Sequence, residues 1–298
     1  MTSGSYERYT HYERFVPSAP LSRFVESLWS YRGYRPPHAS ERVLPSGTVE
    51  LIIPLGAQPL VMPDAGTGSW SSRGAIVSGV RADSFDIGTH QQKDLIGVHF
   101  RPGGAWPLLG VPLDAIQNRH VELEALWGRS AYLLLERVVE ARPSSEAFRI
   151  LSAALLERWR HAKGPLHQGI QGSLRAMMSA DAVPAPAIAR LADRAGLSHR
   201  RFVELFRREV GLPPKSFARV HRFQRALQRL FSEPDAPAAA IALDAGYCDQ
   251  AHWINECRSI AGTTPSRLAA WMRTAPRYIP AEERGQILPI PIPSAPLT

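Results

Sequence analysis

The sequence IARLADRAGLSHRRFVELFRREVGLPP, residues 188–214, returns in altered form as AIALDAGYCDQAHWINECRSIAGTTP, residues 240–265. In both copies an alanine stands four residues before a glycine, and a second alanine stands directly before that glycine. A second glycine follows in each copy, with a proline three residues after it. Only the interval between the two glycines differs, by one residue, so the chain carries one supersecondary unit twice.

The spacing within each copy predicts two helices joined by a tight turn. Gly196 and Gly246 stand where a first helix would end, and glycine adopts the left-handed conformation of such a turn without strain. Ser198 and Asp249 follow as N-caps of a second helix. The alanine four residues before each glycine is small because the second helix must cross the first closely there. Each copy is therefore a predicted helix-turn-helix unit.

Each second helix would bury one face and expose the other. Phe202 and Phe206 share one face, as do Trp253 and Cys257, because residues four apart are neighbours on a helix. The opposite faces carry Arg200, Arg201, Val203, Glu204 and Arg207 in the first copy, and Gln250, His252 and Asn255 in the second. Arg, Gln and Asn suit bidentate contact with guanine or adenine edges in the major groove. Ordinary helical hairpins with solvated charges are the alternative, and the duplication argues against it.

The stretch 186–273 resembles the C-terminal DNA-binding domain of the AraC/XylS family of bacterial transcription regulators. The matching residues are Gly196-Leu197-Ser198, Phe206, Val210-Gly211 and Pro214 in the first unit, and Ile241-Ala242, Ala245-Gly246-Tyr247, Asp249-Gln250, His252-Trp253, Gly262 and Thr264-Pro265 in the second. Cys257 departs from the family, which usually has a large aromatic residue there.

The resemblance implies seven helices, with helix-turn-helix units at about 187–211 and 238–262 joined by one long helix. It also implies a division of labour among the exposed residues. Those that would contact bases are Arg200, Val203 and Glu204 from the first unit and Gln250, His252 and Asn255 from the second. Arg201 and Arg207 would contact phosphates.

Basic residues are concentrated around this repeat. Residues 165–280 hold 16 Arg and Lys against 9 Asp and Glu, whereas residues 1–164 hold 18 against 16. Such a concentration of cations displaces counterions from phosphate, as nucleic-acid binding requires. Only three of the 35 basic residues of the whole chain are lysines, so a genomic preference for arginine could also explain the high arginine content. That preference would not explain where the charge lies.

Length and composition fit a globular protein of two domains. The chain has 298 residues, of which 44% are apolar and 21% charged, which is enough for two separate cores. Nothing approaches the roughly 18 consecutive apolar residues of a membrane span. Residues 1–7 lack the basic and then apolar pattern of a signal peptide. We therefore expect a cytoplasmic protein that is associated with the nucleoid when bound to DNA.

The N-terminal part shows the signals of strands. Residues 48–53, 75–80 and 94–100 are short runs rich in β-branched residues and bounded by Pro and Gly. In residues 96–101, Ile96, Val98 and Phe100 alternate with Gly97, His99 and Arg101, as in a half-buried strand. Residues 21–28 instead space their apolar side chains as an amphipathic helix. A small antiparallel barrel or sandwich is the expected architecture.

Two segments of this part resemble the sensing half of one AraC subgroup: Leu44–Leu51 (LPSGTVEL) and Val98–Ala105 (VHFRPGGA). The resemblance implies a cupin-like barrel that binds an effector or mediates dimerisation. Glu50, His99 and Arg101 are the candidate ligand contacts, although His99 and Arg101 could point into the lumen or into water. His38, His90 and His99 lack the spacing of a metal site, so we expect no metal.

Helical periodicity returns at residues 129–160, where two apolar stripes flank Pro143. Two such helices could pack on the barrel or form a dimer interface. We therefore expect a two-domain α+β protein. A β-rich sensing or dimerisation domain with flanking helices would occupy residues 1–162, and an all-α DNA-binding domain residues 163–278. A proline-rich tail would occupy residues 279–298.

The expected function is sequence-specific regulation of transcription under the control of a small-molecule effector. The expected partner is double-stranded promoter DNA. The protein could form a homodimer and, if it is an activator, would contact RNA polymerase. We expect no cofactor. One alternative is a dimeric regulator without an effector, and another is an enzyme tethered to DNA. We predict no enzyme, because the sequence lacks a Ser/His/Asp elbow, a phosphate-binding glycine loop and paired catalytic carboxylates. The two cysteines, Cys248 and Cys257, both lie in the second unit, outside the N-terminal part where an alkylation-repair enzyme would need one.

Overall fold

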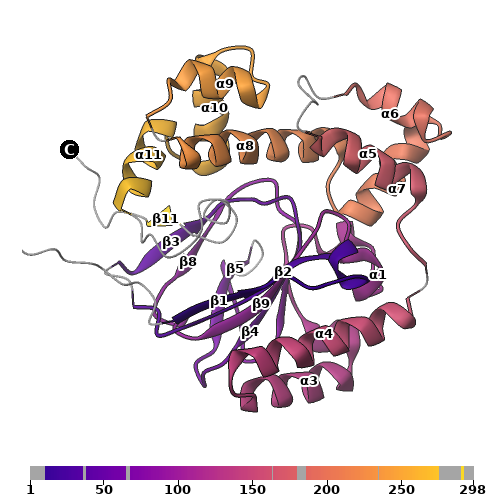
Figure 1. Ribbon diagram of the computed structural model, residues 1–298, viewed down its shortest axis with the longest axis vertical. Helices are drawn as coiled ribbons and strands as arrows, with labels where there is room; N and C mark the ends of the chain where they lie inside the picture. The colour runs from indigo at the N-terminus through magenta and orange to yellow at the C-terminus, as the bar shows by residue number, and fades with distance from the viewer. Residues whose placement is uncertain are drawn as a thin grey trace, which may run out of the picture.

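The computed structural model describes residues 11–35, 38–64, 68–162, 164–179, 186–233, 235–274 and 290–291. The N-terminal half is rich in strands and the C-terminal half is helical, as predicted (Figure 1). Most of the predicted tail, 279–298, lies outside the described residues.

Six antiparallel strands form the main sheet of the N-terminal half. Their order is β1-β2-β9-β4-β7-β10. Their bounds are β1 His11–Phe15, β2 Val25–Arg32, β4 Glu50–Pro54, β7 Ile76–Ser78, β9 Leu95–Phe100 and β10 His120–Glu122. The three strands expected near 48–53, 75–80 and 94–100 are β4, β7 and β9, which lie side by side at the centre of this sheet.

Two smaller sheets cover one face of the main sheet. One has the order β11-β3-β8 and the other pairs β5 with β6. Their bounds are β3 Ser40–Val43, β5 Leu60–Asp64, β6 Gly68–Ser72, β8 Phe85–Gly88 and β11 Ile290–Pro291. A cluster of buried apolar side chains, including Trp29, Ile52 and Leu60, fills the space between the sheets. The predicted β-rich sandwich is therefore confirmed.

Two of the predictions for the N-terminal half are wrong: the burial of one strand and the position of one helix. Strand β9 is buried along its whole length and is not half-buried, because the small sheets cover one face and helices cover the other. His99 consequently retains only 1% of its exposure. The segment expected as a helix near 21–28 is a short 3-10 turn, η1 Leu21–Arg23, followed by strand β2. Pairing with β9 on one side and β1 on the other overrides its helical spacing.

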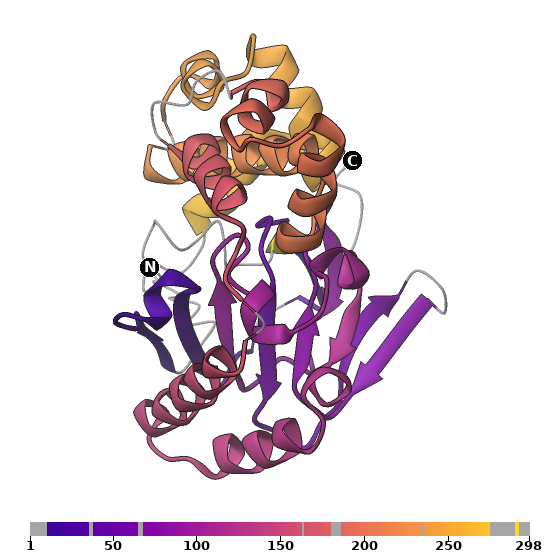
Figure 2. The same ribbon diagram turned by 90° about the vertical axis from the view of Figure 1, so that its right-hand side faces the viewer.

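Helices cover the other face and edge of the main sheet (Figure 2). Their bounds are α1 Trp106–Leu109, η2 Leu113–Ile116, α2 Leu123–Trp127, α3 Arg129–Glu140 and α4 Ser144–Arg160. The two helices expected at 129–160 are α3 and α4. They pack against each other and bury Leu134, Val138, Phe148 and Leu151. This is the intramolecular packing that the sequence allowed, and their part in a dimer stays a hypothesis.

Seven helices form the described C-terminal half, as the family resemblance implies. Their bounds are α5 Gln168–Met178, α6 Ile188–Arg194, α7 His199–Val210, α8 Pro214–Ser232, α9 Ala238–Ala245, α10 Gln250–Ala261 and α11 Pro265–Thr274. Figure 1 shows the long helix α8 with α6 and α7 at one end and α9, α10 and α11 at the other. The two helix-turn-helix units are therefore α6–α7 and α9–α10.

Each of two clusters of buried apolar side chains contains residues from both halves of the protein. The largest cluster runs from the main sheet through Val80 and Leu113 to Phe206 and Val210 of α7. A second cluster is built from α8 to α11 and contains Leu44 of the N-terminal half. Both helix-turn-helix units therefore pack directly against the N-terminal half at these contacts. None of the described helices is long and apolar enough to cross a membrane.

Candidate DNA interface

The turn of each helix-turn-helix unit is stabilised by glycine and a side-chain cap. Gly196 and Gly246 have φ angles of 66° and 92°, in the left-handed region that favours glycine. At the start of α7 the hydroxyl oxygen of Ser198 accepts a hydrogen bond from Arg201 N at 3.3 Å. At the start of α10 the carboxylate of Asp249 accepts one from His252 N at 2.7 Å. Both predicted N-caps are thus observed.

The second helices also bury the faces that their spacing predicted. Phe202, Phe206, Trp253 and Cys257 have no exposed surface. Phe206 packs edge-on against Phe217 of α8 with ring centroids 5.7 Å apart. Burial raises the pKa of the Cys257 thiol to about 12, so this cysteine is protonated at neutral pH. These contacts set the rotation of α7 and α10, and therefore decide which side chains face solvent.

The exposed face of α7 carries charged side chains. Arg200 is 91% exposed, and its Nε donates to Glu204 Oε1 at 3.0 Å. Arg201 lies 3.6 Å from the same carboxylate. This hydrogen bond from Arg200 is the main cause that lowers the pKa of Glu204 below its ordinary value. Arg207 is exposed on this helix and Val203 is half-buried. The face is open to a nucleic acid, and Glu204 balances part of its charge.

The exposed face of α10 is polar and less charged. Gln250 and Asn255 are exposed, and His252 is half-buried against Tyr247 with ring centroids 5.1 Å apart. Nε2 of His252 lies 3.7 Å from Glu256 Oε2. The amides are therefore accessible, whereas the imidazole is partly held by its neighbours.

A buried glutamate, which the sequence analysis missed, anchors α10 to α8. Glu256 accepts hydrogen bonds from Arg222 at 2.7 and 3.1 Å and from the Tyr247 hydroxyl at 3.2 Å. The Arg222 guanidinium also stacks over the Tyr247 ring at 4.8 Å. A glutamate three residues after Trp253, on an apolar stripe, was a usable signal, because a buried carboxylate needs partners.

Residues of the N-terminal half contact the C-terminal end of α10. Arg42 of β3 donates to Ala261 O at 3.1 Å while its guanidinium pairs with Asp86 of β8 at 2.7 and 2.9 Å. Ser84 N donates to Ile260 O at 3.2 Å. A cation and an N–H group thus satisfy carbonyls at the end of this helix, where the macrodipole favours positive charge. The local sequence around Arg42 and Ser84 does not predict these contacts.

The three candidate effector contacts do not form one site. Glu50 and His99 lie together inside the sandwich, with His99 Nδ1 2.9 Å from Glu50 Oε1 and Nε2 3.3 Å from Thr48 Oγ1. Glu50 lines a small cavity of about 60 Å³ between the sheets. Arg101 instead lines a different and larger cavity beside α5, and its Nε donates to Ser22 O at 2.8 Å.

The contact with Glu50 changes the pKa of His99. Burial by itself lowers the pKa of His99, but the hydrogen bond and the negative charge of Glu50 outweigh this effect, with a smaller contribution from Glu26. The pKa of His99 therefore lies above its ordinary value. Among the described residues no group of three or more His, Cys, Asp or Glu side chains could hold a metal ion.

Two family models match the chain. A helix-turn-helix domain matches residues 191–270, and a domain of unknown function (DUF6597) matches residues 13–122. The first match covers both second helices, α7 and α10, and the whole of α8. A search of curated proteins finds no match.

Several solved structures are similar to parts of the chain. The C-terminal domain of AraT, a response regulator from Geobacillus stearothermophilus, is 15% identical over 39% of this chain and 95% of its own, with a TM-score of 0.34. The DNA-binding domain of AdpA in complex with a target DNA is 24% identical over 39% and 99%, with a TM-score of 0.32. Unsaturated fatty acid bound ToxT from Vibrio cholerae is 9% identical over 88% and 96%, with a TM-score of 0.44.

The match to a helix-turn-helix domain falls on the duplicated unit found in the sequence. Both copies have the predicted turn and cap and the predicted buried face. Residues 191–270 of the chain therefore form a helix-turn-helix domain that holds two such units.

Proposed function

We propose that the protein binds an asymmetric promoter site with both units and that a small molecule controls this binding. Arg200, Val203 and Glu204 contact bases from α7, and Gln250, His252 and Asn255 contact bases from α10. Arg201 and Arg207 contact phosphates. The domain limits are 1–162 for the sensing half and 163–278 for the DNA-binding half.

The observation that carries this proposal is the pair of exposed polar faces on two helices of the same construction. Helix α8 has 19 residues, so it is about 28 Å long at 1.5 Å per residue. The units at its two ends are thus separated by a length close to the roughly 34 Å between successive major grooves. Two recognition helices on such a spacer suit adjacent grooves on one side of B-DNA.

Control by an effector is supported by the way the halves meet. Leu44 packs in the core of the second unit, and Gln224 of α8 donates to Pro45 O at 2.6 Å. Arg42 and Ser84 contact the end of α10, as described above. A ligand that moves these residues of the sensing half would therefore also move α8 and α10, because they are in direct contact.

The test is selection of bound sequences from a random DNA pool by the full-length protein, by Arg200→Ala and by Gln250→Ala. We expect a two-part motif whose halves are about one helical turn apart. Each variant should lose preference in one half, because each removes side-chain contacts from one groove.

A matched control is Arg149→Ala, which removes an exposed arginine of α4 that pairs with Glu146 at 2.5 Å, in the sensing half. This variant should select the same motif as the wild-type protein. Loss of both half-sites in either recognition-helix variant, with folding intact, would refute the assignment of one unit to each half.

A further inference from the structure

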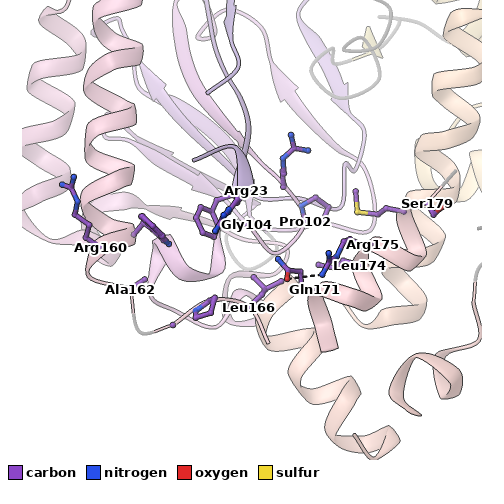
Figure 3. Close-up of a pocket in the computed structure, with 16 residues that line it drawn as sticks. Arg23, Pro102, Gly104, Arg160, Ala162, Leu166, Gln171, Leu174, Arg175 and Ser179 are labelled. Atoms are coloured by element: carbon purple, nitrogen blue, oxygen red, sulfur yellow. Dashed lines mark hydrogen bonds between the residues drawn. The ribbon is translucent and has the colours of Figure 1, made fainter. Parts of the chain in front are cut away.

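A cavity of about 920 Å³ lies between the sensing half and the DNA-binding half. One wall is made by Arg101, Pro102 and Gly104, which belong to the VHFRPGGA segment, and by Phe24. Another is made by the end of α4, and the third by α5 (Figure 3). Its volume lies near the upper end of the roughly 300–1,000 Å³ of typical ligand pockets.

The shape of the wall at Arg101–Gly104 depends on its glycines. A Cβ at Gly104 would lie 2.0 Å from Phe24 O, and one at Gly103, where φ is 74°, would lie 2.7 Å from Leu166 Cδ2. Gly104 therefore lets this wall pack directly on the backbone of Phe24, and Gly103 lets it approach Leu166, just before α5. The cavity wall therefore gives a reason for the two adjacent glycines of the VHFRPGGA segment, which lie outside the strands and outside the DNA-binding surface.

The floor of the cavity is apolar and its rim is cationic. Phe24 and Leu174 are buried, and Trp159 and Leu166 are half-buried beside them. The arginines of the lining are exposed, and they are Arg23, Arg101, Arg160 and Arg175.

None of the described lining residues is acidic. Within the part of the chain that the structure describes, only Arg160 of these four arginines has a carboxylate partner close by, since it donates to Glu157 Oε2 at 3.0 Å. Arg101 and Arg175 donate to neutral oxygens of Ser22 and Gln171, so their charges are not balanced by these bonds. Figure 3 shows Arg23 at the middle of the cavity and Arg175 reaching in from α5, with Arg160 at its outer edge. The rim therefore carries a net positive charge from both halves.

We infer that this cavity binds an amphipathic carboxylate, with its apolar chain on the floor and its anionic head among Arg23, Arg101 and Arg175. An arginine binds a carboxylate through paired N–H donors, and such charge-assisted bonds are the stronger ones. A polyanion such as a nucleotide would leave an apolar floor of this size unused. A neutral apolar molecule would leave the cations unpaired.

Such a ligand would touch both halves of the protein at once. Helix α5 lies against α6 and α7 of the first helix-turn-helix unit, so a ligand held on α5 contacts an element that supports a recognition helix. The inference deepens the proposed function, because it gives the effector a site and a chemical class, and it rests on that proposal for the regulatory role.

The experiment measures binding of dodecanoate to the full-length protein by calorimetry, below its micelle concentration, with dodecanol and hexanoate as comparison ligands. We expect dodecanoate to bind at least about tenfold more tightly than dodecanol, because a hydrogen bond to a charged group is worth about one such factor or more. Hexanoate should also bind more weakly, since it covers less of the floor.

Variants locate the site. Arg23→Gln and Arg101→Gln should each weaken dodecanoate binding about tenfold, and Ala162→Trp should weaken it by filling the cavity. Arg137→Gln, on an exposed arginine of α3 outside the lining, is the matched control and should bind as the wild type does. Circular dichroism and thermal unfolding establish that each variant is folded.

The inference is overturned if dodecanoate does not bind, if dodecanol binds equally well, or if the folded rim variants bind as tightly as the Arg137→Gln control. Anisotropy with the selected DNA site, with and without dodecanoate, tests the proposed function separately. DNA binding without any carboxylate binding would leave the regulator standing and remove this site. Carboxylate binding that leaves DNA affinity unchanged would establish the site and remove its role as an effector site.

Discussion

Exposed arginines on one helix can have different tasks, and α7 offers a direct comparison. Arg200 lies at the start of the helix, where recognition helices meet base edges. Arg207 lies two turns later and is exposed as well. In the proposed function, Arg200 contacts bases and Arg207 contacts a phosphate. The two tasks have different thermodynamic signatures.

We expect Arg200→Ala to cost about 1–3 kcal/mol on the preferred DNA site and to relax preference at one base position. Arg207→Ala should weaken binding to all sequences alike and reduce the salt slope by about one. Titrations of specific and scrambled DNA at several salt concentrations measure both. Equal losses on specific and scrambled DNA for both variants would contradict the base contact of Arg200.

A histidine on α8 makes the stability of the protein depend on pH. Burial is the main cause that lowers the pKa of His221 to about 4, with a smaller contribution from the charge of Arg225. Its ring stacks on Phe217 with centroids 6.0 Å apart. Because the folded pKa lies below the ordinary value of 6.5, the unfolded chain takes up the proton first as the pH falls.

The stabilisation from neutral His221 is therefore complete above about pH 6.5 and is lost as the pH falls towards 4. The loss should amount to roughly 3 kcal/mol, since one pKa unit corresponds to about 1.4 kcal/mol. His221→Phe keeps the stacking and removes the titration, so it should flatten this part of the profile. Urea unfolding between pH 4 and 7 measures the difference, and a variant profile as steep as that of the wild type would contradict the assignment.

At the level of elements, the connection between β3 and β4 in the N-terminal half packs against α8. Gly47 has a φ of 74°, and a Cβ there would lie 3.3 Å from Val220 Cγ1 and 3.8 Å from the Phe217 ring. Gly68 of β6 has a φ of 78°, and a Cβ there would meet nothing within 4 Å. The two glycines therefore carry the same backbone requirement in different surroundings.

Replacing each glycine by alanine separates backbone strain from contact between the halves. Each substitution should cost about 1–2 kcal/mol for the left-handed conformation. Gly47→Ala should cost more, because the Val220 side chain must also shift by a few tenths of an ångström. Chemical unfolding of both variants measures the difference. If Gly68→Ala is at least as destabilising as Gly47→Ala, the close contact at α8 does not contribute to stability.

The predictability of individual elements follows the range of the interactions that form them. The turns at Gly196 and Gly246 and the caps at Ser198 and Asp249 depend on neighbours within a few residues, so their spacing was sufficient. Strand β2 was mistaken for part of a helix, because its pairing with β9, about 70 residues away, decides its conformation. The periodicity of a short apolar segment does not report such pairing.

The whole molecule should behave as one cooperative unit. A Cβ on Gly211, which follows α7, would lie 3.0 Å from Val80 Cγ2 and 3.2 Å from Leu113 Cβ. The same apolar cluster contains the main sheet and the first helix-turn-helix unit. The two halves therefore bury surface against each other that neither could cover by itself.

We expect calorimetry of the full-length protein to give one unfolding transition, with agreement between the calorimetric and van't Hoff enthalpies. Leu113→Ala should lower its midpoint, since removing a buried leucine side chain costs roughly 2–5 kcal/mol. Leu243→Ala, at a position that is 57% exposed, is the matched control and should shift the midpoint little. Two well-separated transitions, of which Leu113→Ala moved only one, would contradict a shared core.

The amino-acid sequence was sufficient to predict the duplicated unit, its capped turns, the buried and exposed faces of α7 and α10, and the β-rich character of the first half. These features follow from residue spacing and from backbone preferences, which act locally. The tertiary structure was needed to show the pairing of Glu256 with Arg222, the separation of Arg101 from Glu50 and His99, and the cavity between the halves. Each of these depends on how elements far apart in the chain pack together, which local spacing does not encode.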